Sequence, residues 1–336
     1  MDKKRLINIL VSIIPKGFRV AICQIFLSEG VIYRSFHDAV NYLRFSRTFS
    51  HNSLKRIESE MVVNYHTLEK GLSFKMPKFH FGVDRIKIII KLLDEFIRKG
   101  YDINNIFYNS AVSVLQEYVQ WHKLHNKNVS WLEDKIKKYP VKAHKLGGTI
   151  QVRRDAYLKS GKGNFEDLAH SRKSIRDYTK KNVDLSIIKK AIELAQLSPS
   201  ACNRQPARVY VVNNKDKLYE VLQLQNGNRG FSKSINKVLV VCADSSVYRG
   251  STELFAPLVD GGVFAMSLVY SLQYYGLGTC ILNWFSSMRN DKKLHKILGI
   301  PSSEKVILLI AVGHLPRTLK VTKSTKKPAK DIINII

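Results

Sequence analysis

The sequence predicts an α+β fold, with a mixed or mainly antiparallel sheet flanked by helices and a mostly helical region before it. Two patterns indicate this. Residues 1–160 contain long stretches with apolar residues at helical spacing, and helix and strand signals alternate from residue 166 onward. The composition is that of a folded chain, with 45% hydrophobic and 24% charged residues among 336. This length favours two domains, which we expect at residues 1–160 and 161–336.

The N-terminal half contains two clear amphipathic stretches. Val83–Ile97 places apolar side chains on one helix face, and Gly100 follows as a stop signal. Asn109–His122 repeats the helical pattern. We therefore expect a mostly helical N-terminal region, to which the sequence assigns no activity.

A polar cluster interrupts the apolar pattern between residues 61 and 73. His66, Glu69 and Lys70 stand at i, i+3 and i+4 spacing, which places them on one helix face. Such a patch can contact a substrate. A helix that ends at Gly71 explains the same residues, and we favour the helix end.

The first residues combine a basic start, Met1–Arg5, with an apolar run, Leu6–Ile14. These look like the first two parts of a signal peptide, but Pro15 interrupts the pattern and no small-residue cleavage site follows. The run is shorter than the roughly 20 residues that span a bilayer. A helix lying on a membrane surface and a helix packed on the protein's own core both fit it.

The net charge is +28, and the excess of Lys and Arg is spread over both halves of the chain. We interpret most of it as solvated surface, because net charge reports on solubility and non-specific binding. Attraction to an anionic membrane or an anionic substrate is the alternative. The four cysteines form no C-x-x-C pair and no Cys/His metal spacing, so we expect no metal site and no need for an oxidising compartment.

Residues 141–165 contain several glycines and show no strong period, so we place the domain boundary near residue 160. Beyond it the pattern changes to short alternating segments. We expect helices at 185–197, 215–224, 253–275 and 291–298, and strands at 208–213, 238–244, 279–284 and 305–313. There is no G-x-G-x-x-G and no P-loop motif, which excludes both nucleotide-binding fingerprints.

The segment His170–Tyr178 concentrates cationic side chains just before the first of these helices. Arg172, Lys173 and Arg176 bracket the hydroxyl of Ser174. Arginine offers a fixed fork of donors that suits phosphate, and serine adds a short donor. By itself such a cluster is more often a solvated basic turn, so its weight depends on the motifs that follow.

Three further motifs follow in order. The loop Ser198–Pro206 is dense in small polar side chains, and Tyr275–Cys280 ends the long helix with two glycines that allow close backbone approach. Lys323–Pro328 adds a second basic cluster. In the first loop, the side chains able to present amide and hydroxyl groups to a ring or a polyol are Ser200, Asn203 and Gln205.

Together these four motifs resemble the FMN-dependent nitroreductase family over about residues 166–336. The resemblance implies a nitroreductase-like fold with a long central helix at a dimer interface. The family's R-[R/K]-S-x-R segment holds the FMN phosphate and ribityl chain and maps onto Arg172, Lys173, Ser174 and Arg176. Its P-S-x-x-N-x-Q-P loop lies near the flavin and maps onto Pro199, Ser200, Asn203 and Gln205.

The remaining cofactor positions are also carried over from the family. An Asn that precedes a strand by about ten residues corresponds to Asn228, and the G-L-G segment beside the flavin ring corresponds to Gly276 and Gly278. The family's late basic pair before Pro, often Arg-Lys, maps onto Lys326 and Lys327. Lysine keeps a point charge there but loses the bidentate fork.

The resemblance implies an enzyme in which the flavin performs the chemistry. It implies a homodimer with two FMN sites, each lined by both chains, with the helix at 253–275 in the interface. NADH or NADPH would supply hydride, and no side-chain nucleophile or base is required. The acceptor is not identifiable from the motifs.

Three hypotheses follow from the sequence. The first is a cytoplasmic FMN oxidoreductase. Residues 65–73 look like a segment of nitroreductase-like proteins associated with bacterial surface polysaccharide synthesis. That resemblance would make the acceptor a sugar-linked or lipid-linked intermediate, and it would give the basic N-terminus a place at the inner membrane face.

The second hypothesis is a flavin-binding regulatory or partner module without turnover. The third, a nucleic-acid-binding protein, ranks last because no recognised module is present, and we expect no nucleic-acid partner.

Overall fold

The computed structural model describes residues 31–33, 35–36, 38–40, 53–141, 146–249 and 251–336. The apolar run at residues 6–14, and any membrane contact it makes, lie outside the described residues. Among the residues described, no helix has the length and hydropathy to cross a bilayer.

The N-terminal half forms a helical group with its own core. Leu68, Phe96 and Leu115 are completely buried there. The pattern at residues 83–97 becomes α4, and the pattern at residues 109–122 becomes the middle of α5, so both predicted helices are confirmed. The helices of this group are α3 (Leu54–Leu72), α4 (Val83–Arg98), α5 (Ile106–Leu124) and α6 (Ser130–Ile136).

The C-terminal half is built on a four-stranded sheet in the order β2-β3-β5-β4, in which every pairing is antiparallel. This confirms the predicted α+β class with an antiparallel sheet. The predicted strand ranges agree with the observed ones to within one residue at each end. The strands are β2 (Ala207–Val212), β3 (Lys237–Asp244), β4 (Gly278–Asn283) and β5 (Glu304–Gly313).

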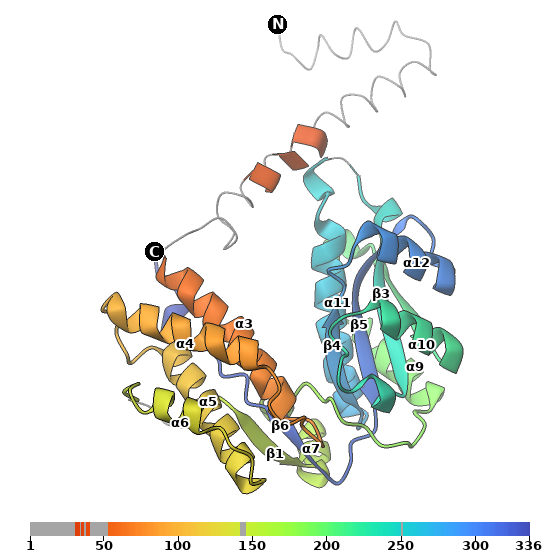
Figure 1. Cartoon of the computed structure of the whole chain (residues 1–336). Coiled ribbons are helices and arrows are strands. Elements are labelled where there is room, and N and C mark those ends of the chain that lie inside the picture. The colour runs from red at the N-terminus through yellow and green to blue at the C-terminus, as the bar shows by residue number, and fades with distance from the viewer. Residues whose placement is uncertain (1–30, 34, 37, 41–52, 142–145, 250) are drawn as a thin grey trace, which may run out of the picture.

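Helices cover both faces of this sheet (Figure 1). Successive residues of β3 point to opposite faces, so Val240 packs with α10 and α12 while Val241 packs with α9 and α11. Both β3 residues are completely buried, which explains the continuous apolar run of that strand. The helices are α9 (Leu185–Ala195), α10 (Lys215–Leu224), α11 (Ala256–Tyr274) and α12 (Met288–Leu298).

The boundaries of these helices follow local chemistry. The range predicted for α10 is exact. Helix α12 ends at Gly299, whose φ of 67° is the left-handed cap that glycine favours. Helix α11 begins three residues later than predicted, with Pro257 in its first turn, where a missing N–H costs nothing.

The segment between the halves is more ordered than the sequence predicts. It contains β1 (Thr149–Arg153), α7 (Arg154–Gly161) and α8 (Phe165–Ser171). Strand β1 pairs antiparallel with β6 (Thr318–Thr322), so a late segment of the chain returns to the N-terminal half. The expected domain boundary at residue 160 falls inside α7, and it stays a prediction.

Candidate functional site

The predicted phosphate segment, His170–Tyr178, lies along the open edge of the sheet, beside β4. The Ile175 N–H donates to the Thr279 carbonyl at 2.8 Å, and Ser174 forms a parallel bridge with Thr279. Ile175 is completely buried. Because alternate residues of an extended segment point to opposite sides, Ser174 and Arg176 point away from the core that Ile175 enters.

The glycine at position 278 explains how the two segments come so close. A Cβ built on Gly278 would lie 3.0 Å from Cγ1 and Cγ2 of Ile175. Gly276, two residues earlier, has a φ of 81°, a conformation that side chains rarely adopt. The G-L-G motif therefore lets the phosphate segment pack closely against β4.

Arg176 is the central cation of the site. Its Nε and Nη1 atoms are buried and have no hydrogen-bond partner among the described residues. Burial raises the pKa of the Cys280 thiol beside it, while the charges of Arg176, Lys70 and Arg172 oppose that rise. Three cations from two parts of the chain, α3 and the segment at residues 172–176, thus lie near one buried thiol.

Lys70 belongs to the polar cluster that the sequence predicts to be a helix end and not part of a binding site. It comes from the last turn of α3, and its Nζ donates to the Gly227 carbonyl at 3.2 Å. Burial lowers the pKa of Lys70, and the nearby charge of Arg176 lowers it further. Its spacing with His66 and Glu69 was a signal, but the sequence does not show that α3 packs against the C-terminal half.

No carboxylate in the described part of the chain neutralises this cluster. Among the residues that the structure describes, Lys70, Arg172 and Arg176 form no ion pair with an acidic side chain. A group of like charges kept partly out of water is unfavourable unless an anion compensates it. The cluster is therefore suited to an anionic ligand.

Lys173 and Lys326 form a second basic position next to the first. The Lys173 Nζ donates to the His170 carbonyl at 2.9 Å. Burial lowers the pKa of Lys173, and Arg172 and Lys326 act in the same direction. The structure therefore brings the late basic cluster close to the phosphate segment, while Lys327 lies over the ring of Phe107 in α5.

Asn228 is buried in the loop that receives Lys70. Its Nδ2 donates to the carbonyls of Leu222 at 2.8 Å and Gln225 at 2.5 Å. The amide nitrogen therefore holds the turn after α10 together. The carbonyl of the preceding residue, Gly227, is the acceptor of Lys70, so the loop lies next to the cation cluster.

The predicted flavin-side loop, Ser198–Pro206, lies at the other end of the sheet from the phosphate segment. Ala207, the first residue after the loop, pairs with Ala243 of β3, which pairs with Lys305 near the start of β5. Gly278 pairs with Gly313 at the end of β5, at the opposite end of the sheet. The two predicted halves of the site are thus roughly 20 Å apart along the strands of one chain. A single chain does not bring Pro199, Ser200, Asn203 and Gln205 together with Arg172 and Arg176.

The loop itself is tightly braced. Cys202, Asn203 and Gln205 have φ values of 50°, 55° and 52°, a concentration of left-handed backbone that is typical of functional loops. The guanidinium of Arg204 binds both oxygens of Glu253 at 2.6 Å.

The base of the loop is fixed and its tip is open. The Ala201 N–H donates to Asp260 of α11 at 3.0 Å, and the Gln205 N–H donates to the Ser200 hydroxyl at 2.9 Å. The side chains of Asn203 and Gln205 remain exposed. A pocket of about 380 Å³ lies between this loop and α11.

Comparison with known proteins identifies the family of the C-terminal half. Residues 169–228 and 222–314 match the model of the nitroreductase family. The C-terminal half of the chain is a nitroreductase-family domain. The family match contains the phosphate segment, the flavin-side loop and the G-L-G motif, and it leaves the N-terminal helical group unassigned.

Two relatives match the nitroreductase-family domain at low identity. One is an Archaeoglobus fulgidus protein that is provisionally named NADH dehydrogenase/NAD(P)H nitroreductase, 24% identical over 147 residues that cover 44% of this chain and 83% of that protein. The other is an FMN reductase [NAD(P)H] of Bacillus subtilis, 23% identical over 171 residues that cover 46% of this chain and 66% of the relative.

Solved structures resemble the same part of the chain. A nitroreductase family protein from Streptococcus pneumoniae is 24% identical, with a TM-score of 0.46, and the match covers 52% of this chain and all of that one. An FMN-dependent nitroreductase from Clostridium difficile is 25% identical, with a TM-score of 0.39, and covers 44% of this chain and 85% of that one.

Proposed function

We propose that this chain is an FMN-dependent oxidoreductase that takes hydride from NADH or NADPH and passes electrons to a small-molecule acceptor. The observation that carries the proposal is the half-buried side chain of Arg176, whose Nε and Nη1 atoms are buried and have no hydrogen-bond partner among the described residues. The names of the Bacillus subtilis and Archaeoglobus fulgidus relatives support the donor and the cofactor.

The residues present fit the phosphate of FMN. A phosphomonoester brings close to two negative charges and three strong acceptor oxygens. Arg176 offers two buried donors that lack acceptors, and Arg172 adds a second guanidinium to the same cluster. Arginine forks match phosphate geometry, so these two side chains would hold the phosphate, with Ser174 as a short donor.

The bound flavin supplies the hydride-transfer chemistry, and the protein supplies binding and orientation. Arg172, Ser174 and Arg176, beside β4, would hold the phosphate end of the cofactor. The braced loop at residues 198–206 offers amide groups for the other end. No side chain of the chain has to act as a nucleophile.

The active form that we propose is a homodimer. The phosphate segment and the flavin-side loop lie at opposite ends of one chain's sheet, so one complete site takes a segment from each of two chains. Helix α11 supports this, because Leu258, Val259 and Val263 are 40%, 62% and 40% exposed on an apolar helix that is otherwise packed on the sheet. A second copy of the chain would cover this face.

For the acceptor we propose a sugar-linked or lipid-linked intermediate of surface polysaccharide synthesis. This rests on the resemblance of residues 65–73 to nitroreductase-like proteins of that setting. Residues 65–72 form the end of α3, which contributes Lys70 to the cation cluster. The enzyme would work in the cytoplasm, with its basic N-terminus at the inner membrane face. Partitioning onto anionic liposomes, before and after deletion of residues 1–20, tests the membrane contact, and equal partitioning would refute it.

The absorption spectrum of the purified protein tests the main proposal. We expect a yellow protein with the visible bands of oxidised flavin, which bleach when NADH or NADPH is added under anaerobic conditions. A protein that binds FMN but is never bleached by either nucleotide would be a flavin-binding module without turnover. A protein that takes up no FMN would contradict the proposal altogether.

A further inference from the structure

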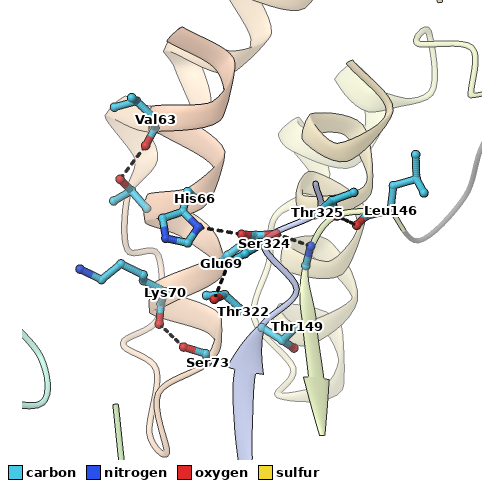
Figure 2. A network of polar contacts seen from close by, with 12 residues as sticks. Val63, His66, Glu69, Lys70, Ser73, Leu146, Thr149, Thr322, Ser324 and Thr325 are labelled. Atoms are coloured by element: carbon cyan, nitrogen blue, oxygen red, sulfur yellow. Dashed lines mark hydrogen bonds and ion pairs between the residues drawn. The ribbon is translucent and has the colours of Figure 1, made fainter. Parts of the chain in front are cut away.

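The N-terminal helical group contributes a cation to the same cluster as the phosphate segment. Lys70 lies in the last turn of α3, and its Nζ donates to the carbonyl of Gly227 in the C-terminal half at 3.2 Å. The charge of Arg176 lowers the pKa of Lys70, and the charge of Lys70 opposes the rise in the pKa of the Cys280 thiol. Figure 2 shows Lys70 pointing away from Glu69, which faces the other side of α3. The two neighbouring side chains therefore connect α3 to different parts of the chain.

Glu69 anchors α3 so that the position of Lys70 is fixed. Glu69 is completely buried; its Oε1 accepts from the Gly148 N–H at 2.9 Å, and its Oε2 lies 2.9 Å from Nδ1 of His66. Around it, the Thr322 hydroxyl pairs with Ser324 at 2.9 Å, next to β6 (Figure 2). The buried Leu68 and Leu72 pack the same turn into the helical core.

Lys70 keeps donors available for a ligand. An ammonium group has three N–H donors, and the carbonyl of Gly227 takes one of them at 3.2 Å. No acidic side chain among the described residues pairs with Lys70, and the like charge of Arg176 lowers the pKa of its ammonium group. Two cations at one half-buried place are most stable when an anion lies between them.

We propose that Lys70 binds the phosphate of FMN together with Arg172 and Arg176, so that the N-terminal helical group completes the cofactor site. The inference rests on the proposed function, because it takes the FMN phosphate as the anion. It adds a residue that lies outside the family match, which begins at residue 169. Bound FMN would therefore join α3 to the C-terminal half through an anion that both halves contact.

Binding of FMN and of riboflavin, measured by quenching of flavin fluorescence, separates the phosphate contact from the rest of the site. We expect Lys70→Met to weaken FMN binding about tenfold or more, the loss typical of one charge-assisted hydrogen bond. Riboflavin lacks the phosphate, so its dissociation constant should stay within about twofold. Lys55→Met is the matched control, because exposed Lys55 lies about 22 Å from Lys70 along α3.

The outcomes distinguish this inference from the proposed function. If the parent protein binds no FMN, both fail. If the parent binds FMN and Lys70→Met binds it equally well, or loses FMN and riboflavin to the same extent, only the role of Lys70 fails.

A second measurement needs no variant, in case Lys70→Met does not fold. In the parent protein, Lys70 should be acetylated by acetic anhydride when FMN is absent and protected when it is bound, as read by mass spectrometry of the peptide. Riboflavin should give no protection, and the acetylation of Lys55 should not change. Equal acetylation of Lys70 with and without saturating FMN would overturn the inference.

Discussion

Arg176 shows at the residue scale how a ligand site differs from the ordinary interior of a protein. Buried polar groups normally find a hydrogen-bond partner, and two of the guanidinium nitrogens of Arg176 find none among the described residues. Such a group lowers the stability of the ligand-free protein and is retained where binding compensates for it.

We therefore expect Arg176→Met to have opposite effects on stability and binding. Without FMN, the free energy of unfolding should stay equal or rise by roughly 1 kcal/mol, because the substitution removes a cation with two buried nitrogens that have no partner among the described residues. FMN affinity should fall by about tenfold or more. Thermal unfolding with and without FMN measures both, and Arg229→Met, at an exposed arginine, is the control. A clear loss of stability in the FMN-free variant would contradict this account.

The residues of the site were predictable to different degrees. The cluster of Arg172, Ser174 and Arg176 was recognisable because its members are close in sequence, and their assigned cofactor roles remain predictions. Lys70 was noticed for its helical spacing but interpreted as part of a helix end. Its partners, Gly227 and Arg176, are more than 100 residues away, and no local pattern reveals such a contact.

At the scale of elements, the strands and helices of the C-terminal half were well predicted because each has a strong apolar period. Strand β1 was missed because it is only five residues long and none of its residues is fully buried. Helix α7 was missed because it follows β1 directly, within a segment that contains several glycines. Tertiary pairing with β6 stabilises β1, and this cannot be read from a five-residue window.

The braced loop at residues 198–206 should respond to acid through Glu253. Its partner Arg204 lowers the pKa of Glu253 from 4.5 to about 2. Since the folded pKa lies below the unfolded one, the stabilisation is fully present above about pH 4.5 and is lost as the pH falls toward 2.

Melting temperatures of the parent and of Glu253→Gln at several pH values test this. The difference between them should be constant near neutral pH and shrink below about pH 4.5, because the carboxylate then gains a proton. Glu220→Gln, at an exposed position of α10, should show no such trend. A difference that does not change with pH would refute the role of this ion pair.

At the scale of the whole molecule, the exposed apolar face of α11 sets the expected assembly. Val259 is 62% exposed, and Leu258 and Val263 lie beside it on the same helix. The complementary halves of the predicted cofactor site lie at opposite ends of the sheet, which agrees with two chains meeting through α11.

We expect Val259→Lys to convert a dimer into monomers and to weaken FMN binding as well. An unpaired ammonium in the interface costs several kcal/mol, and a twofold axis introduces it twice, so the dimer dissociation constant should rise at least about a hundredfold. Sedimentation velocity measures the change. Tyr219→Lys alters a 67% exposed residue of α10, on the opposite face of the sheet, and should leave the dimer intact. A Val259→Lys protein that remains dimeric would exclude α11 from the interface.

The pairing of β1 with β6 has a consequence for how the chain folds during synthesis. Strand β1 ends at Arg153 and β6 begins at Thr318, so almost the whole nitroreductase-family domain is translated between them. Contacts between such distant segments form late, because a long loop must close first. Gly148, next to β1, can offer its N–H to Glu69 early, but β1 has no strand partner until β6 leaves the ribosome. The α3–β1–β6 layer that positions Lys70 is therefore completed only after the four-stranded sheet, beside which Arg176 lies, has been made.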